Sequence, residues 1–140
     1  MPPRKQRPSR KGLAVGRDVR ETSKALRRFA LGLPGATEHF PWGERVAKIA
    51  GKVFVFLGTD PLPDGEIGFS VKLPESGREA LELPFTKPTG YGLGKAGWVS
   101  ASFSAKDAPP LAILEDWILE SYRAVAPKRI LAKLADRAPR

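Results

Sequence analysis

Apolar positions recur every three or four residues between 18 and 32, and this spacing predicts an amphipathic helix. Asp18 can cap its start, and Glu21 stands three residues on, as in a capping box. Gly32, followed by Leu33-Pro34-Gly35, is typical of a helix end. The first ordered element expected along the chain is therefore a helix of about four turns.

Strand patterns follow the helix. Residues 46–49 and 53–57 are joined by Ala50-Gly51-Lys52, a short hairpin signal. Residues 53–57 are apolar on both faces, which predicts a central place in the sheet. Residues 58–65 read as a loop. Residues 67–72 and 98–103 alternate between apolar and polar positions, and each alternation predicts a half-buried strand.

Helical patterns return in the second half of the chain. A short helix is expected over 75–83, and a longer one after Pro109-Pro110, with its apolar stripe running from Leu111 to Val125. Pro127 should break or kink that helix, and the apolar face continues through residues 130–134. Hairpin-linked strands with flanking helices indicate an α+β fold: an antiparallel sheet of about four to five strands with the N- and C-terminal helices packed on one face.

The 140 residues suffice for one hydrophobic core, so one domain is expected, at 18–137. Residues 1–17 are polar, basic and proline-bearing and cannot bury much apolar surface, so they are interpreted as a disordered basic arm. No apolar run approaches the length of a membrane span and no secretory signal is present, which favours a cytoplasmic location.

Composition narrows the possible chemistry. The chain has no cysteine and one histidine, His39, which argues against disulfides, thiolate zinc sites, iron–sulfur clusters, cysteine nucleophiles and histidine-rich metal sites. We therefore predict no cofactor and no metal. The net charge is +9. Residues 1–20 hold seven lysines and arginines against one aspartate, and residues 123–140 hold six against one, so the positive charge lies at the two ends. Such ends suit DNA or another polyanion, or serve only to keep the chain soluble.

Residues 92–97 match the spacing G-x-G-x-x-G but are followed by a strand pattern, and two prolines precede them, which is the wrong context for a dinucleotide site. We interpret them as a glycine-rich turn tipped by Lys95 and flanked by Lys87 and Tyr91. A winged DNA-binding loop has this character, and so has an ordinary flexible hairpin.

Residues 38–44 place Glu38, His39 and Glu44 around two aromatic rings. A catalytic interpretation uses one of the ionisable groups as a general base, but no partner nucleophile is evident. A tight turn anchored in the core by Phe40 and Trp42 is favoured instead. The aromatic residues Trp42, Tyr91 and Trp98 could stack on bases or line a pocket, although large aromatics are more often core or turn anchors.

These motifs, in this order, resemble the MmcQ/YjbR family of small bacterial proteins. The matching stretches are 29–35, Glu38 with 40–43, 48–56, Val71-Lys72, 89–91 through Lys95 to Val99, and Ser121-Tyr122, and the resemblance spans about 24–136. It implies a CyaY-like or double-wing fold and, by fold-level analogy, DNA binding. It also marks Lys48 and Lys52 around the first hairpin, and Lys95 with Trp98 in the second wing. It implies no catalytic residues.

The predicted function is weakly sequence-selective, non-enzymatic DNA binding. The alternative is a protein- or small-ligand-binding regulatory domain, and a third possibility is an enzyme using Glu38, His39 or Glu44. No membrane partner is expected, and the sequence does not identify which protein, if any, is a partner. The cations that could contact phosphate are Arg4, Lys5, Arg7, Arg10, Lys11, Lys48, Lys52, Lys87, Lys95, Lys128, Arg129 and Lys133.

Overall fold

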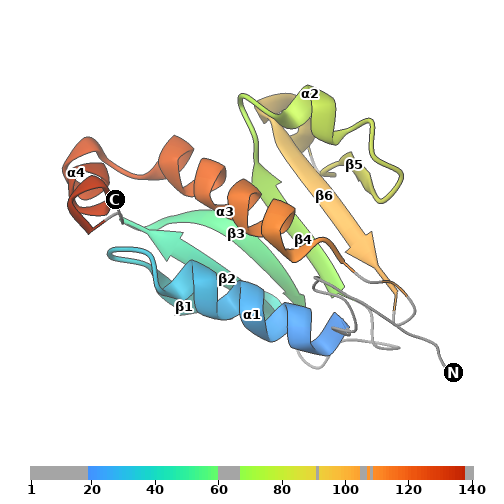
Figure 1. Cartoon of the computed structure of the whole chain (residues 1–140), viewed down its shortest axis with the longest axis horizontal. Helices are drawn as coiled ribbons and strands as arrows, with labels where there is room; N and C mark the ends of the chain where they lie inside the picture. The colour runs from blue at the N-terminus through green and yellow to red at the C-terminus, as the bar shows by residue number, and fades with distance from the viewer. Residues whose placement is uncertain (1–18, 60–66, 91, 105–106, 108, 138–140) are drawn as a thin grey trace, which may run out of the picture.

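The computed structural model describes residues 19–59, 67–90, 92–104, 107 and 109–137. Their centre is an antiparallel sheet of six strands in the order β1-β2-β3-β4-β6-β5 (Figure 1). The predicted basic arm, residues 1–17, lies outside the described residues. The elements are α1 (Val19–Leu31), β1 (Thr37–His39), the 3-10 turn η1 (Pro41–Gly43), β2 (Glu44–Ile49), β3 (Lys52–Thr59), β4 (Ile67–Lys72), α2 (Gly77–Ala80), β5 (Thr86–Pro88), the 3-10 turn η3 (Leu93–Ala96), β6 (Trp98–Phe103), α3 (Leu111–Val125) and α4 (Lys128–Arg137).

The α+β class and the antiparallel sheet are confirmed, with six strands rather than four to five. The two strands that the pattern missed, β1 and β5, are three residues long and form the edges of the sheet. An alternation cannot be recognised over three residues. The expected helix over 75–83 is reduced to the four residues of α2, and Pro127 separates α3 from α4 as predicted.

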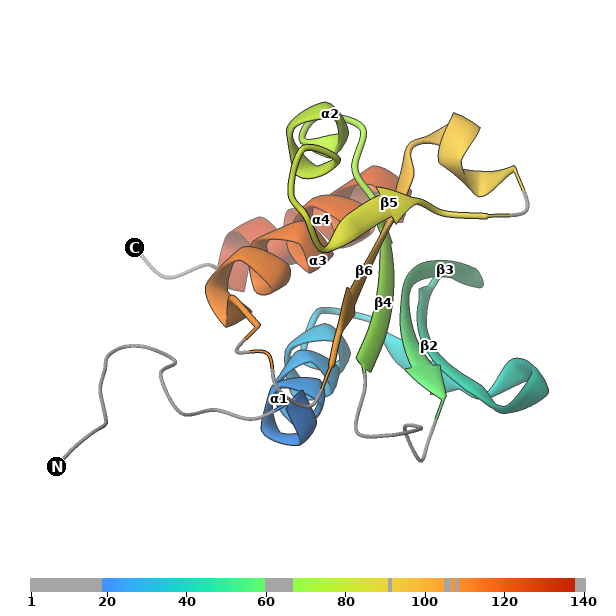
Figure 2. The ribbon, with the colours of Figure 1, turned by 90° about the vertical axis from the view of Figure 1, so that its right-hand side faces the viewer.

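Helices α1 and α3 cover one face of the sheet, with α3 lying over β3 and β4 (Figure 2). The core between these layers holds the predicted stripe of α3, including Trp117 and Tyr122, which are 7% and 0% exposed. Tyr122 stands edge-to-face against Phe54, with ring centroids 5.2 Å apart, and its hydroxyl donates to the carbonyl of Pro34 at 2.6 Å. One side chain thus ties α3 to the sheet and to the turn after α1.

Strand β3 is central, as its apolar run predicted, and it departs from regular pairing with β2 at two places. The register with β2 passes from Val53 to Val55 and from Phe56 to Gly58, which leaves Phe54 and Leu57 as extra residues. Such bulges reorient side chains, so that a residue which strict alternation would place on one face of the sheet points to the other. Both extra residues are buried, at 0% and 6% exposed.

Ser121 of α3 joins β3 to β4 where the strands do not bond directly. Its hydroxyl donates to the carbonyl of Phe54 at 2.5 Å and accepts from the backbone N–H of Lys72 at 2.8 Å. Ser121 is fully buried. The helix therefore supplies a hydrogen-bonding group that completes the ladder beside the bulge at Phe54.

One buried hydroxyl in the described part of the chain has no hydrogen-bond partner: Thr22 Oγ1 of α1. Because an unsatisfied buried polar group costs about 1–3 kcal/mol, we expect Thr22→Val to raise the free energy of unfolding by about 1 kcal/mol. Urea unfolding followed by circular dichroism measures this change. A decrease in the stability of Thr22→Val would mean that the hydroxyl has a partner after all.

The turn between β2 and β3 holds two residues with positive φ, Ala50 at 51° and Gly51 at 81°. A two-residue hairpin turn of this kind favours asparagine at its first position, whereas alanine is strained there. We expect Ala50→Asn to stabilise the fold by about 0.5–1 kcal/mol. The melting temperature checks this, and an unchanged or lower value would contradict it.

Candidate nucleic-acid interface

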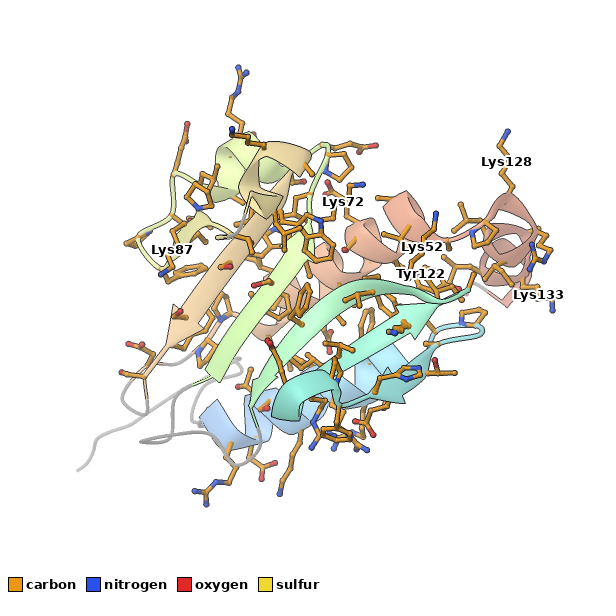
Figure 3. The ribbon with its side chains drawn as sticks, turned by 180° about the vertical axis from the view of Figure 1, so that it is seen from behind. Lys52, Lys72, Lys87, Tyr122, Lys128 and Lys133 are labelled. Atoms are coloured by element: carbon orange, nitrogen blue, oxygen red, sulfur yellow. The ribbon has the colours of Figure 1, made fainter. Side chains whose placement is uncertain are left out.

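Exposed cations from three elements lie at one end of the molecule, where the hairpin between β2 and β3 lies beside α4 (Figure 1). Figure 3 shows that Lys128 and Lys133 project from different sides of α4. The packing that joins these elements is apolar: a Cβ on Gly35 would meet the Ile49 side chain at 2.8 Å and that of Ile130 at 4.0 Å. We call this surface the basic end. It consists of Lys52, Arg123, Lys128, Arg129 and Lys133, all of them exposed.

Helix α4 begins with two of these cations, Lys128 and Arg129, and has no acidic residue in its first turn. The N-terminus of a helix carries the positive end of the helix dipole, so it favours anions and disfavours cations. If helix stability were the only requirement, aspartate or glutamate would be expected in the first turn of α4. Within the described residues, no carboxylate forms an ion pair with any cation of the basic end. Among the described side chains, the positive potential there is therefore left uncompensated.

The sequence predicted four of the five cations of the basic end. Arg123 was counted in the charge of the C-terminal region but not proposed as a contact. The apolar stripe of α3 runs through Tyr122 and Val125, so Arg123, between them, falls outside it and is exposed. That inference was available from the spacing alone.

The other predicted cations lie elsewhere. Lys48 is half-buried in β2, four residues before Lys52. Lys87 is exposed in β5, and Lys95 is exposed in η3 between Gly92 and Gly97, whose φ angles of 79° and 94° confirm a glycine-dependent turn. The five cations of the arm, Arg4, Lys5, Arg7, Arg10 and Lys11, lie outside the described residues.

Of the three aromatic residues predicted to stack on bases or line a pocket, the structure describes the side chain of Trp98. Trp98 is 8% exposed and packs edge-to-face on Phe56, with centroids 5.4 Å apart. It is therefore a packed ring rather than an open stacking surface. Tyr91 and the Trp42 side chain lie outside the described residues.

Phe40 does not anchor the 38–44 turn in the core, contrary to the expectation from sequence. It is 51% exposed, and the Arg45 guanidinium lies 4.6 Å from the centroid of its ring. The cation holds the aromatic ring at the surface, because the ring face attracts positive charge. Pro41 and Gly43 do form a tight turn, η1.

Glu38 is fixed between two arginines. It accepts two hydrogen bonds from Arg27 of α1, at 2.6 and 3.0 Å, and one from Arg45 of β2. The hydrogen bond from Arg27, reinforced by Arg45 and opposed by partial burial, lowers the pKa of Glu38 to about 2. A carboxylate held so firmly in its ionised form is a poor general base.

We expect Glu38→Gln to destabilise the fold by about 1–2 kcal/mol at pH 7, since charge-assisted hydrogen bonds are removed while water screens the partly exposed Arg27. The pKa is lowered in the folded state, so the stabilisation is present above pH 4.5, the ordinary value, and is lost as the pH falls toward 2. Urea unfolding at pH 7 and pH 3 measures it. A difference between wild type and variant that is equal at both pH values would contradict this assignment.

The other ionisable side chains of residues 38–44, His39 and Glu44, do not lie beside the Glu38 carboxylate. His39 follows it in β1 and therefore points to the opposite face of the sheet, where Nε2 lies 3.0 Å from the Thr37 hydroxyl. Partial burial raises the pKa of Glu44 in β2. These residues do not converge on one point with Glu38.

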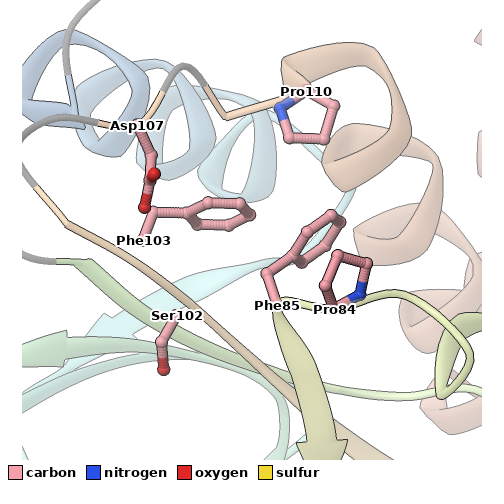
Figure 4. A pocket seen from close by; sticks show the side chains of 6 residues that line it. All are labelled: Pro84, Phe85, Ser102, Phe103, Asp107 and Pro110. Atoms are coloured by element: carbon pink, nitrogen blue, oxygen red, sulfur yellow. The ribbon is translucent and has the colours of Figure 1, made fainter.

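One pocket of 440 Å³ opens between the start of β5, the end of β6 and the start of α3 (Figure 4). Its floor is the pair of rings Phe85 and Phe103, 4.8 Å apart, and the Asp107 carboxylate lies at its rim. The described lining residues include no lysine or arginine. The two rings at its floor make the described part of the pocket suited to an apolar group.

Two further observations concern the described residues alone. No three histidine, aspartate or glutamate side chains among them are grouped so that they could hold a metal ion. No helix among them is long and apolar enough to cross a membrane.

An open antiparallel sheet, helices on one face, and projecting turns at η1 and η3 define the class of fold that the sequence led us to expect. The YjbR family model matches residues 31–124, and the chain belongs to this family. A crystal structure of a Deinococcus radiodurans protein with a DUF419 domain is similar, with 24% sequence identity and a TM-score of 0.62, over 80% of this chain and 86% of that one. That likeness concerns the fold alone. No curated protein matches the chain.

Proposed function

We propose that this protein binds DNA without strong sequence preference and without catalysing a reaction, and that the basic end is its principal contact with phosphate. Lys52, Lys128, Arg129 and Lys133 contribute point charges from the hairpin and α4. Phosphate neutralisation by such side chains releases counterions and supplies affinity that does not depend on sequence.

The observation that carries the proposal is the start of α4. Two cations, Lys128 and Arg129, occupy the positions where the helix dipole favours acidic residues. Local choices that oppose stability are expected where a protein has a functional site. An anion bound here would meet the helix dipole and both side chains together.

The proposal is tested by replacing Lys128 and Arg129 with glutamine in the full chain. Fluorescence anisotropy with a labelled 20-base-pair duplex should show an affinity about tenfold or more lower at 0.1 M salt, since each neutralised phosphate contributes a slope of about 0.9. The melting temperature should stay equal or rise, because removing cations from a helix N-terminus gains about 0.3–1 kcal/mol for each.

The matched control exchanges Lys24 of α1 and Arg78 of α2 for glutamine, which removes the same charge from exposed positions elsewhere. This control should leave DNA affinity within about twofold. Equal decreases in both double variants would mean that net charge alone attracts the duplex, and the basic end would then have no special role.

The alternative function, recognition of a protein or small ligand, is supported by one feature, the pocket at Phe85 and Phe103. A pocket of this size, with two phenylalanine rings at its floor and one carboxylate among its described lining residues, is suited to a small hydrophobic or cationic group. Phe103→Ala would remove part of its floor without altering any cation of the basic end.

A further inference from the structure

The face of the sheet opposite the helices carries a continuous row of neighbouring residues that crosses all six strands. Each member pairs directly with the next in the register of adjacent strands. With strands about 4.8 Å apart, the row spans roughly 24 Å. From β1 to β5 it consists of His39, Val46, Phe56, Ser70, Ser100 and Lys87. Val46 is fully buried, so the accessible part of the row runs from Phe56 to Lys87.

Hydroxyl groups occupy the middle of this row. The oxygens of Ser70 and Ser100 lie 2.7 Å apart, and Thr89, which follows β5, places its hydroxyl 2.9 Å from that of Ser100. Three hydroxyls from adjacent segments can share their protons among themselves or turn them toward an acceptor. All three are half-buried, so they form the floor of the face rather than its rim.

Lysines flank the hydroxyls on this face. Lys87 pairs with Ser100, and Lys72 stands two residues after Ser70 in β4, on the same face. Figure 3 looks onto this face and shows both. Strand alternation also places Lys48 here. Alternation places one described carboxylate, that of Glu44, on this face as well. Because the described lysines of the face outnumber it, the surface favours an anionic partner.

Phe56 adds an aromatic ring to the row, between Val46 and Ser70. It is partly exposed, and the edge-to-face contact with Trp98 holds it in place. A ring fixed on an open sheet offers a stacking surface to a base that is not already stacked in a duplex. Base pairs inside a double helix cannot use it.

We infer that this sheet face binds a short stretch of single-stranded nucleic acid, with phosphates on Lys72, Lys87 and the hydroxyl cluster, and a base stacked on Phe56. The inference rests on the proposed function and adds a second surface with a different substrate, the unpaired strand. The accessible part of the row covers three strand spacings, roughly 14 Å, which suits a short stretch of about two or three nucleotides.

The test measures binding of a fluorescein-labelled deoxythymidine octamer, which forms no duplex, to the full chain. Exchanging Lys72 and Lys87 together for glutamine should lower octamer affinity about tenfold at 0.1 M salt, with a log–log salt slope shallower by about 1.4. Phe56→Leu should lower it by about fivefold or more, and this decrease should persist at high salt because stacking is not ionic. Neither variant should change affinity for the 20-base-pair duplex more than twofold.

The pair Lys24→Gln and Arg78→Gln serves again as the control, and thermal melting confirms that each variant is folded. If Phe56→Leu does not fold, the lysine pair decides the question. Suppose that duplex binding persists but the octamer does not bind, or binds equally well to wild type and to the variant with Lys72 and Lys87 exchanged. This result overturns the inference about the sheet face and leaves the proposed function standing. Absence of binding to both octamer and duplex overturns the proposed function as well. Octamer binding that survives Lys128→Gln with Arg129→Gln supports a separate surface.

Discussion

Replacing Lys52, Lys128, Arg129 and Lys133 together with glutamine is expected to weaken duplex binding by roughly 10²- to 10³-fold at 0.1 M salt. Each phosphate that is no longer neutralised reduces the slope of log affinity against log salt by about 0.9, so four such phosphates reduce it by about 3.6. The four side chains are exposed and form no described ion pair, and their replacement should leave the fold intact. Anisotropy titrations at salt concentrations above and below 0.1 M give both quantities.

The same titrations separate the basic end from the N-terminal arm. Because α1 begins at Val19, a truncation should remove residues 1–18 and no more. We expect the shortened chain to bind the duplex with a smaller but still substantial salt slope, and the fourfold variant to lower that slope further. If only the full-length chain binds, the arm is the contact with DNA, and the basic end is not.

Ser121→Ala is expected to reduce the free energy of unfolding by about 2–4 kcal/mol, a large effect for a single hydroxyl. The hydroxyl serves the carbonyl of Phe54 and the N–H of Lys72 at once, at 2.5 and 2.8 Å. Removing it leaves two backbone groups without these partners beneath α3, and each costs about 1–3 kcal/mol when buried unsatisfied.

Urea unfolding of Ser121→Ala measures this effect, and Ser23→Ala in α1 is the control, since no bridging hydrogen bond of this kind involves its hydroxyl among the described residues. The free energy of unfolding of Ser23→Ala should lie within about 0.5 kcal/mol of the wild-type value. A change well below the expected range in Ser121→Ala would show that water or a shifted strand satisfies both backbone groups.

The long elements of the fold could be predicted because their side-chain period extends over enough residues. The helices α1 and α3 and the strands β3, β4 and β6 were all expected close to their observed bounds. The edge strands β1 and β5 were not, because three residues carry no recognisable period and their pairing depends on partners distant in the chain. The bulge that turns Phe54 into the core was not predictable either, since the run 53–57 is apolar throughout.

The residues of the site could be predicted from the sequence better than their arrangement in space. The cations of α4 and Lys52 were identified from charge alone, but their meeting at one end depends on how α4 folds back to Ile49 and Gly35. Phe40 was placed in the core because it is aromatic, whereas its contact with Arg45 holds it at the surface. The row across the face opposite the helices emerges only from the register of six strands.

The sheet ends on both sides in three-residue strands, and β5 closes with Pro88, which has no N–H to donate. Short edges of this kind offer few free backbone groups on which another copy of the chain could add a strand. If the protein binds along a polyanion as proposed, its sheets are therefore not expected to join edge to edge when many copies lie close together. Crowding on such a scaffold would otherwise favour aggregation into extended β-structure.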